Sequence, residues 1–201
     1  FYDLDRLLDP EETEFDLIRC NDRLSLNICS VGLDARIARD VASYKRLPLL
    51  HGFRAYLLSV VVNIFRGISE HYVVEIDGEC IDGKQTMICA CNCRFYGGGF
   101  YPTPDADPTD GWMDVVIVHG VSRLTAAKVI GMYQKGHAKD LPEYITVLRA
   151  KEMTITSTDG KPFVLNLDGE NRPADSLRVW VPQRKMHFVV PRGVEILPPG
   201  T

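Results

Sequence analysis

Short apolar segments separated by turn signals dominate the chain after residue 70, and they constrain its fold more than any other feature. Asp-Gly pairs, which favour tight turns between strands, begin at Asp77, Asp82, Asp159 and Asp168. Many such segments, without regular alternation with helices, are typical of a β-sandwich. We predict strands at residues 72–76, 86–91, 113–118, 145–148, 153–156, 163–167, 177–181 and 187–190. The sequence therefore predicts a mainly β fold, a two-layer β-sandwich of many short strands with two or three accessory helices.

Two of the helices are expected before the first of these strands. Residues 38–44 predict a short helix, and residues 53–68 predict a longer one in which Leu57 and Ile64 lie on one face. The apolar stretch inside the longer helix, residues 55–65, falls well short of the ~20 residues that a membrane span needs. We therefore expect a buried helix there.

A third helix is expected between the strands. Ser122 is a favourable N-cap, Gly136 a favourable end, and Leu124 is one of the residues expected on the apolar face. Residues 1–20 are charged and weakly periodic, so they are interpreted as a lead-in from an upstream domain. The sandwich domain is then expected to comprise residues 21–201.

Charge and the first residues limit the class of protein. The chain carries 23 basic and 27 acidic residues, a net charge of -4, without a dense basic stripe, which disfavours nucleic-acid binding. Residues 1–6 contain neither an initiator Met nor a signal-peptide pattern, so we expect that an N-terminal part is missing. A cytoplasmic protein is predicted.

The six cysteines include an alternating group, Cys89, Cys91 and Cys93. Alternation in a strand directs all three side chains to one face. This spacing suits neither a Cys-x-x-Cys zinc motif nor a disulfide framework. We interpret the cysteines as small core residues of a reduced protein, with a zinc site as the alternative.

A glycine-rich and acidic segment follows the alternating cysteines. The triple glycine at residues 97–99 has two explanations, a tight turn or a cradle of backbone N–H groups for an anion. Asp105, Asp107 and Asp110 superficially resemble a calcium loop, but counting from Asp105 puts Thr109 at the fifth position, where that loop needs an acidic or amide residue. We interpret the segment as a carboxylate-rich loop, which either holds a hard cation or is solvated.

Two Asp-Gly-Glu triplets invite comparison, one beginning at Asp77 and one at Asp168. Most such triplets are hairpin turns. The second follows a predicted strand, so Asp168 would lie at the strand end with Glu170 beside it. Two neighbouring carboxylates raise one another's pKa, and one of them could then accept a hydroxyl proton as a general base.

Together these segments resemble the C-terminal part of the bacterial diacylglycerol kinase family, which also contains the sphingosine and ceramide kinases. The resemblance covers about residues 16–195 and is strongest from Asn92 to Val118. It rests on the segments Asn27–Ala35, Gly52–Tyr56, Asn92–Val118, Val121–Arg123 and Leu165–Glu170.

The resemblance implies a two-domain lipid kinase of the NAD kinase-like fold. Its N-terminal domain binds ATP through a Gly-Gly-Asp-Gly-Thr motif, which this sequence lacks, so we expect the chain to be inactive alone. The implied reaction is phosphorylation of a lipid hydroxyl, most simply diacylglycerol to phosphatidic acid, at the membrane surface. The implied partners are the lipid, the chain's own N-terminal domain and a second copy in a possible homodimer.

The resemblance also implies site residues. Asp168 matches the family's catalytic base and Glu170 its acidic neighbour. Asp110 and Asp114 match a loop that holds structural Mg²⁺, with backbone carbonyls around Trp112 and Met113 as further ligands. Two alternatives remain: a non-catalytic β-sandwich binding module, and part of an NAD kinase-like nucleotide kinase.

Overall fold

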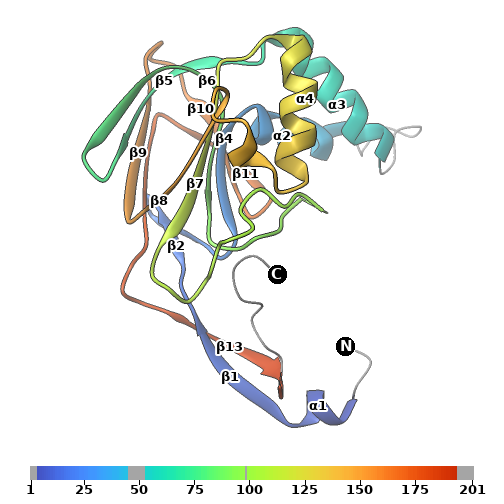
Figure 1. Ribbon diagram of the computed structural model, residues 1–201, viewed down its shortest axis with the longest axis vertical. Coiled ribbons are helices and arrows are strands. Elements are labelled where there is room, and N and C mark those ends of the chain that lie inside the picture. The colour runs from blue at the N-terminus through green and yellow to red at the C-terminus, as the bar shows by residue number, and fades with distance from the viewer. Residues whose placement is uncertain (1–3, 45–52, 98, 194–201) are drawn as a thin grey trace.

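The computed structural model describes residues 4–44, 53–97 and 99–193, and strands form its body (Figure 1). The helices are α1 (Leu4–Leu8), α2 (Leu33–Tyr44), α3 (Phe53–Arg66), α4 (Arg123–Gln134) and the 3-10 helix η1 (Ala138–Asp140). The strands are β1 (Pro10–Phe15), β2 (Ile18–Cys20), β3 (Arg23–Ser25), β4 (Ile28–Gly32), β5 (Glu70–Ile76), β6 (Glu79–Cys91), β7 (Met113–His119), β8 (Ile145–Ala150), β9 (Glu152–Ser157), β10 (Phe163–Leu167), β11 (Glu170–Ala174), β12 (Ser176–Trp180) and β13 (Met186–Pro191).

Eleven of the strands in the described part of the chain form one curled antiparallel sheet. Its main path is β11-β10-β4-β6-β5-β9-β12-β2-β3, and β7 and β8 branch from β6. The long strand β6 makes the branching possible, because it pairs with β5, β4 and β7, with a register shift between Gln85 and Met87. The predicted mainly β, sandwich-like fold is confirmed.

The sheet is buried on both faces where β6 crosses it. Ile88 and Ala90 face a core shared with β5, β9 and β12, whereas Cys89 and Cys91 face a second core shared with α4. The predicted orientation of the alternating cysteines is therefore confirmed for the two that are fully buried; Cys93 lies beyond the strand and is half-buried. All of them are free thiols, and burial raises the pKa of Cys89 and Cys91.

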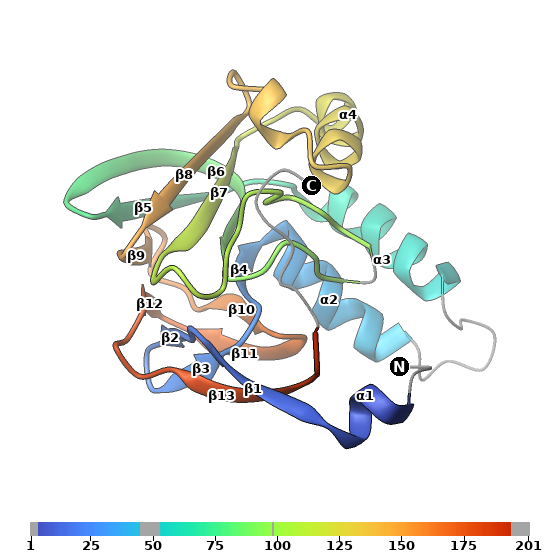
Figure 2. The same ribbon diagram turned by 60° about the horizontal axis from the view of Figure 1, so that its bottom comes forward.

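The helices α2, α3 and α4 gather on one side of the sheet (Figures 1 and 2). Helix α2 begins five residues earlier than predicted. Helix α4 begins where Ser122 predicts, because the Ser122 hydroxyl accepts a hydrogen bond from Thr125 N at 3.1 Å. Its buried face was predicted correctly at Tyr133 and wrongly at Leu124: Ala126, Val129 and Tyr133 face the core, whereas Leu124 is 91% exposed.

The expectation that α3 is a buried apolar helix is also corrected. Its fully buried residues include the polar Ser59 and Asn63, while Phe65 is 70% exposed. The physical reason is that α3 packs on α2 through hydrogen bonds: Ser59 Oγ donates to Ile37 O, and Asn63 Nδ2 donates to Asp40. No helix within the described residues is both long and apolar enough to cross a bilayer.

Two further features concern the beginning of the chain. Strands β1 and β13 pair with each other in a separate ribbon below the sheet (Figure 2). Strand β2, in contrast, belongs to the main sheet, and its Ile18 and Cys20 are buried in the core. The boundary expected between residues 20 and 21 therefore falls inside the sheet, because these apolar side chains need the core.

Candidate functional site

Asp168 occupies the turn between β10 and β11 and binds a second turn of the chain. Its carboxylate accepts hydrogen bonds from Ser25 Oγ at 3.0 Å and from the backbone nitrogens of Leu26, Asn27 and Ile28 at 2.7, 3.0 and 2.9 Å. Asp168 N in turn donates to Ile28 O. A carboxylate offers about four acceptor sites, so these donors use nearly all of its capacity.

A third segment joins these two turns. Asn92 Nδ2 donates to Leu26 O, and Asn27 Nδ2 donates to Phe95 O, each at 2.9 Å. Cys93 lies close by, and its pKa is raised to about 11, mainly by burial and further by the charge of Asp168. The structure thus brings together the Asp168 turn, the turn before β4 and the polar segment after β6, three of the segments on which the resemblance rests.

Glu170 begins β11, two residues after Asp168. Its side chain is exposed and makes no hydrogen bond or ion pair with the described residues. Glu170 pairs with Leu167, and Leu165 pairs with Arg172, so these four residues share one face of the hairpin. Of the two carboxylates Asp168 and Glu170, only Glu170 has no hydrogen-bond or ion-pair partner among the described residues.

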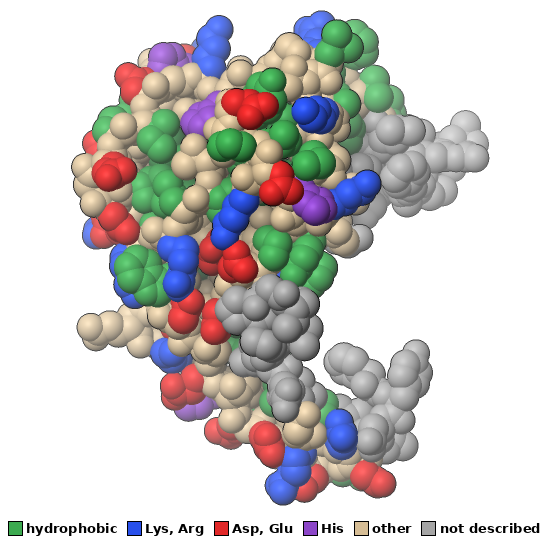
Figure 3. All heavy atoms as spheres, in the orientation of Figure 1, with side chains coloured by type: hydrophobic (Ala, Val, Ile, Leu, Met, Phe, Trp, Pro, Cys, Tyr) green, Lys and Arg blue, Asp and Glu red, His purple; other side chains and the backbone are tan. Residues whose placement is uncertain are grey.

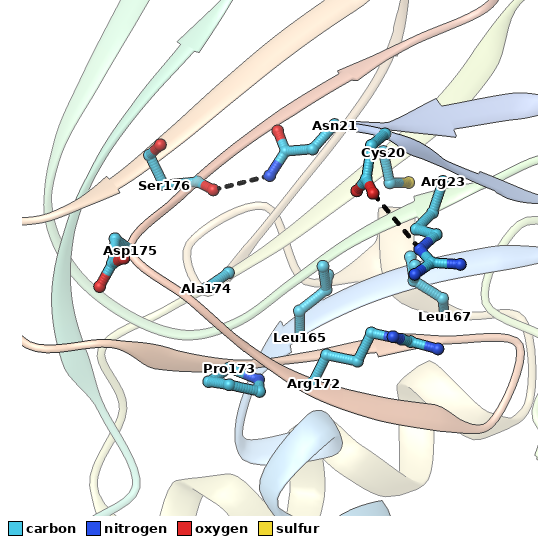
Figure 4. A pocket seen from close by; sticks show the side chains of 11 residues that line it. Cys20, Asn21, Arg23, Leu165, Leu167, Arg172, Pro173, Ala174, Asp175 and Ser176 are labelled. Atoms are coloured by element: carbon cyan, nitrogen blue, oxygen red, sulfur yellow. Dashed lines mark hydrogen bonds and ion pairs between the residues drawn. The ribbon is translucent and has the colours of Figure 1, made fainter.

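A pocket of about 330 Å³ opens on that same face of the hairpin (Figure 4). Its floor includes Leu165, Leu167 and Ala174, and Arg23 and Arg172 lie at its wall. Arg172 makes no hydrogen bond or ion pair with described residues, whereas Arg23 lies 3.5 Å from Asp22. The pocket thus combines an apolar floor with Arg172, and its lining also includes the acidic residues Asp22 and Asp175.

The first Asp-Gly-Glu triplet is a hairpin turn between β5 and β6, as predicted. Asp77 has a positive φ of 47°, close to the 48° of Asp168. Its carboxylate also binds another segment, because it accepts hydrogen bonds from the backbone nitrogens of Lys151 and Glu152. The two triplets therefore share one local structure, and only their surroundings differ.

The glycine-rich segment forms a tight turn. Tyr96 and Phe100 exchange backbone hydrogen bonds across it, and Gly97 and Gly99 have φ values of 56° and 129°. Gly98 lies outside the described residues. The turn interpretation of this segment agrees with the structure, and its aromatic residues pack towards Tyr133 of α4.

The Asp110–Asp114 loop is surrounded by basic side chains. Asp110 accepts a hydrogen bond from Trp112 N and forms an ion pair with Arg149. Lys151 Nζ donates to the carbonyl of Gly111. Both basic groups also lie over the Trp112 ring, with Lys151 Nζ 4.1 Å from its centroid.

Asp114, the second predicted metal ligand, is buried at the beginning of β7. Burial raises its pKa to about 6, and Arg149 opposes that shift. No group of three or more His, Cys, Asp or Glu side chains in the described part of the chain is placed to hold a metal ion. Arg149 and Lys151 engage oxygen atoms of this loop, so Mg²⁺ could bind there only by displacing them, and the metal stays a prediction.

Residues 27–197 match the family described as "YegS C-terminal NAD kinase beta sandwich-like domain". The chain belongs to this family. A Staphylococcus carnosus protein named "Putative lipid kinase" is 23% identical over 82% of this chain and 52% of its own length. A Mycobacterium tuberculosis protein named "Diacylglycerol kinase" is 28% identical over 64% of this chain and 40% of its own length.

Solved structures agree with the YegS C-terminal fold. A Bacillus anthracis protein described as a "putative diacylglycerol kinase" superposes with a TM-score of 0.61 at 18% identity, over 86% of this chain and 54% of that one. This likeness shows the fold. The chain spans about half the length of the relatives named here.

Two buried carboxylates of the chain were missed by reasoning from sequence. Asp16 is buried, accepts a hydrogen bond from Gly111 N at 2.6 Å and lies 3.3 Å from Lys185 Nζ, so it anchors the acidic loop. Asp34 lies in the first turn of α2 and accepts hydrogen bonds from Ser30 and Tyr96, while burial raises its pKa. A Gly-x-Asp pattern after a strand was the available signal for Asp34; Asp16 had none.

Proposed function

We propose that this protein is part of an ATP-dependent lipid kinase that transfers a phosphoryl group to the hydroxyl of a diacylglycerol-like lipid and yields phosphatidic acid. The observation that carries the proposal is the joining of the Asp168 turn with the Asn27 and Asn92 segments, in a chain whose relatives include a protein named diacylglycerol kinase. Residues far apart in the sequence thereby form one polar site.

The acidic pair supplies the proton chemistry in this proposal. Phosphoryl transfer requires a positioned hydroxyl and a group that accepts its proton. Asp168 is the proposed base and Glu170 orients the hydroxyl. The Asp168 carboxylate accepts hydrogen bonds from four donors, so one of these hydrogen bonds must break when the carboxylate takes a proton.

The lipid is proposed to approach through the pocket beside the β10–β11 turn. Its floor of Leu165, Leu167 and Ala174 suits the apolar part of a glycerolipid, and Arg172 suits a negative charge near the reacting end. The side chain of Glu170 lies on the same hairpin face as this pocket. ATP would be bound mainly by a part of the protein outside this chain, and no step is assigned to a metal ion.

The test is transfer of labelled phosphate from ATP to diacylglycerol by the full-length natural form of the protein. Asp168→Asn is expected to reduce the rate about 100-fold or more, as loss of a general base does. Glu170→Gln is expected to reduce it less. A rate that stays unchanged in Asp168→Asn would reject the assignment.

The first triplet offers a matched control. Asp77→Asn changes an Asp with the same turn conformation and the same kind of backbone contacts, so it loses similar hydrogen bonds at a distant hairpin. It should leave phosphate transfer nearly unchanged. Equal losses in both variants would mean that Asp168 acts on folding and not on chemistry.

A second candidate, a binding module without chemistry, is favoured by one observation. The four donors on Asp168 give its carboxylate a complete structural role without any catalysis. A full-length protein that binds diacylglycerol vesicles but transfers no phosphate to lipid would support this alternative.

A further inference from the structure

Helix α3 buries polar side chains and exposes apolar ones, which is the reverse of an ordinary surface helix. Ser59 and Asn63, four residues apart, are fully buried against α2, whereas Val61 and Phe65, also four residues apart, are 42% and 70% exposed. Surface helices normally direct their apolar stripe towards the core. The face of α3 that carries Val61 and Phe65 is therefore exposed in the described structure.

The beginning of α4 extends this apolar surface. Arg123 Nη2 donates to Phe65 O at 3.2 Å, and the Arg123 guanidinium lies 5.5 Å from the centre of the Phe65 ring. This contact joins the end of α3 to the start of α4. The next residue, Leu124, is 91% exposed. We call Val61, Phe65 and Leu124, together with Arg66, Arg123 and Lys128, the tip patch.

All charged residues of the tip patch are basic. Neither α3 nor α4 contains an Asp or Glu, although the whole chain carries 27 acidic residues. Arg123 and Lys128 form no ion pair with described residues, and Lys128 lies one helical turn from Leu124. Only Arg66 is partly neutralised, by Asp40. In Figure 3, Lys/Arg and hydrophobic side chains lie side by side at the upper edge, where α3 and α4 meet.

We propose that the tip patch docks the protein on an anionic lipid bilayer. Phe65 and Leu124 enter the boundary between head groups and acyl chains, and Arg123 and Lys128 bind lipid phosphates around them. The inference rests on the proposed lipid-kinase function for its purpose, because the substrate must be taken from a membrane.

A bilayer fits these observations better than other partners. Exposed apolar side chains surrounded by basic ones are the pattern of interfacial helices, which gain free energy from apolar burial and from attraction to anionic lipids. A nucleic acid would use the basic groups but leave Leu124 and Val61 without a contact. The net charge of -4 also argues that the basic tip is a local feature, not a consequence of overall composition.

The test is co-sedimentation of the protein with vesicles of phosphatidylcholine, with and without phosphatidylglycerol. Binding is expected with phosphatidylglycerol and is expected to weaken as salt rises. Phe65→Ser and Leu124→Ser should each reduce it about tenfold, because each removes a large apolar side chain from the lipid. Arg123→Gln and Lys128→Gln should each reduce it about fivefold.

Matched controls lie on other parts of the surface. Leu8 is 82% exposed and Lys161 has a highly exposed side chain, so Leu8→Ser and Lys161→Gln change the same residue types away from the tip patch. Both should bind vesicles as the unchanged protein does. Failure to bind anionic vesicles, or equal effects of the Leu8 and Leu124 variants, would overturn the proposal, as would equal binding to neutral vesicles.

A second measurement separates this inference from the proposed activity. In the full-length natural form, Asp168→Asn should reduce phosphate transfer about 100-fold or more and leave vesicle binding unchanged. The double variant Phe65→Ser/Leu124→Ser should slow phosphorylation of diacylglycerol in anionic vesicles but not of a short-chain diacylglycerol dispersed in detergent. Normal vesicle binding with no kinase activity would reject only the proposed function; normal activity on vesicles by the double variant would reject only the tip patch.

Discussion

The carboxylate of Asp168 lies 3.0 Å from the backbone nitrogen of Asn27, so the turn of the β10–β11 hairpin is bound to the segment that joins β3 to β4. The two residues are 141 positions apart in the sequence. Asp77 makes the same kind of contact with Lys151 and Glu152. In both cases an Asp in a left-handed turn satisfies backbone N–H groups that would otherwise lack an acceptor.

Replacing either Asp should therefore lower the free energy of unfolding. In Asp168→Asn and Asp77→Asn, the new amide nitrogen faces hydrogen-bond donors and the charge is lost, which costs about 1–2 kcal/mol in each case. Urea denaturation of both variants measures this directly. A loss in one variant alone would contradict the structural equivalence of the two turns.

The pKa of Asp114 gives a prediction about pH. Burial raises this pKa to about 6, so between its ordinary value and pH 6 the folded state binds more protons than the unfolded state. The stability that this group contributes is complete only below its ordinary pKa of 3.8, and it is lost as the pH rises from there through 6. Asp114→Asn cannot ionise and should be more stable than the unchanged protein at pH 7, by on the order of 1–2 kcal/mol.

The measurement is the difference in unfolding free energy between the two proteins at several pH values. The difference should be small at pH 4 and grow towards pH 7. A difference that does not change with pH would mean that Asp114 titrates normally. Asp114→Asn would instead be destabilising at pH 7 if the carboxylate there bound a cation with substantial affinity.

The sequence predicted the elements that depend on local chemistry. Most strands after residue 70, the start of α4 at Ser122 and the burial of Cys89 and Cys91 follow from periodicity or capping, whereas β1 and β2 lie in the segment that was interpreted as a lead-in. Strand β11 was missed because its sequence, with Pro173 and charged neighbours, is not apolar. It lies at the edge of the sheet, where such a strand is tolerated.

Features set by distant contacts could not be predicted. The apolar spacing of α3 suggested a buried face, but the polar contact of Asn63 with Asp40 of α2 determines its orientation. Asp168 was located at its strand end from the sequence. Its four donors come from residues 25–28, and only the folded sheet places that segment beside it.

The acidic loop gives a prediction about divalent cations. Lys151 Nζ donates to the Gly111 carbonyl and lies over the Trp112 ring, so Mg²⁺ must compete with a side chain already in place. Lys151→Met removes this competitor. Millimolar Mg²⁺ should raise the melting temperature of Lys151→Met more than that of the unchanged protein. An equal response, or none in either protein, would count against a metal site in this loop.

Gly32 joins β4 to α2 and gives the last prediction. Its φ is +90°, and a Cβ there would lie 2.6 Å from the backbone oxygen of Thr86 on β6. Gly32→Ala therefore adds a clash with backbone to the strain of a left-handed conformation, and we expect a loss of roughly 3 kcal/mol or more. Gly160 is the matched control, because its φ is +68° but nothing lies within 4 Å of an added Cβ. Gly160→Ala should lose only about 1 kcal/mol. The comparison separates the two costs, since equal unfolding free energies for the two variants would show that the approach of β6 to Gly32 contributes nothing to stability.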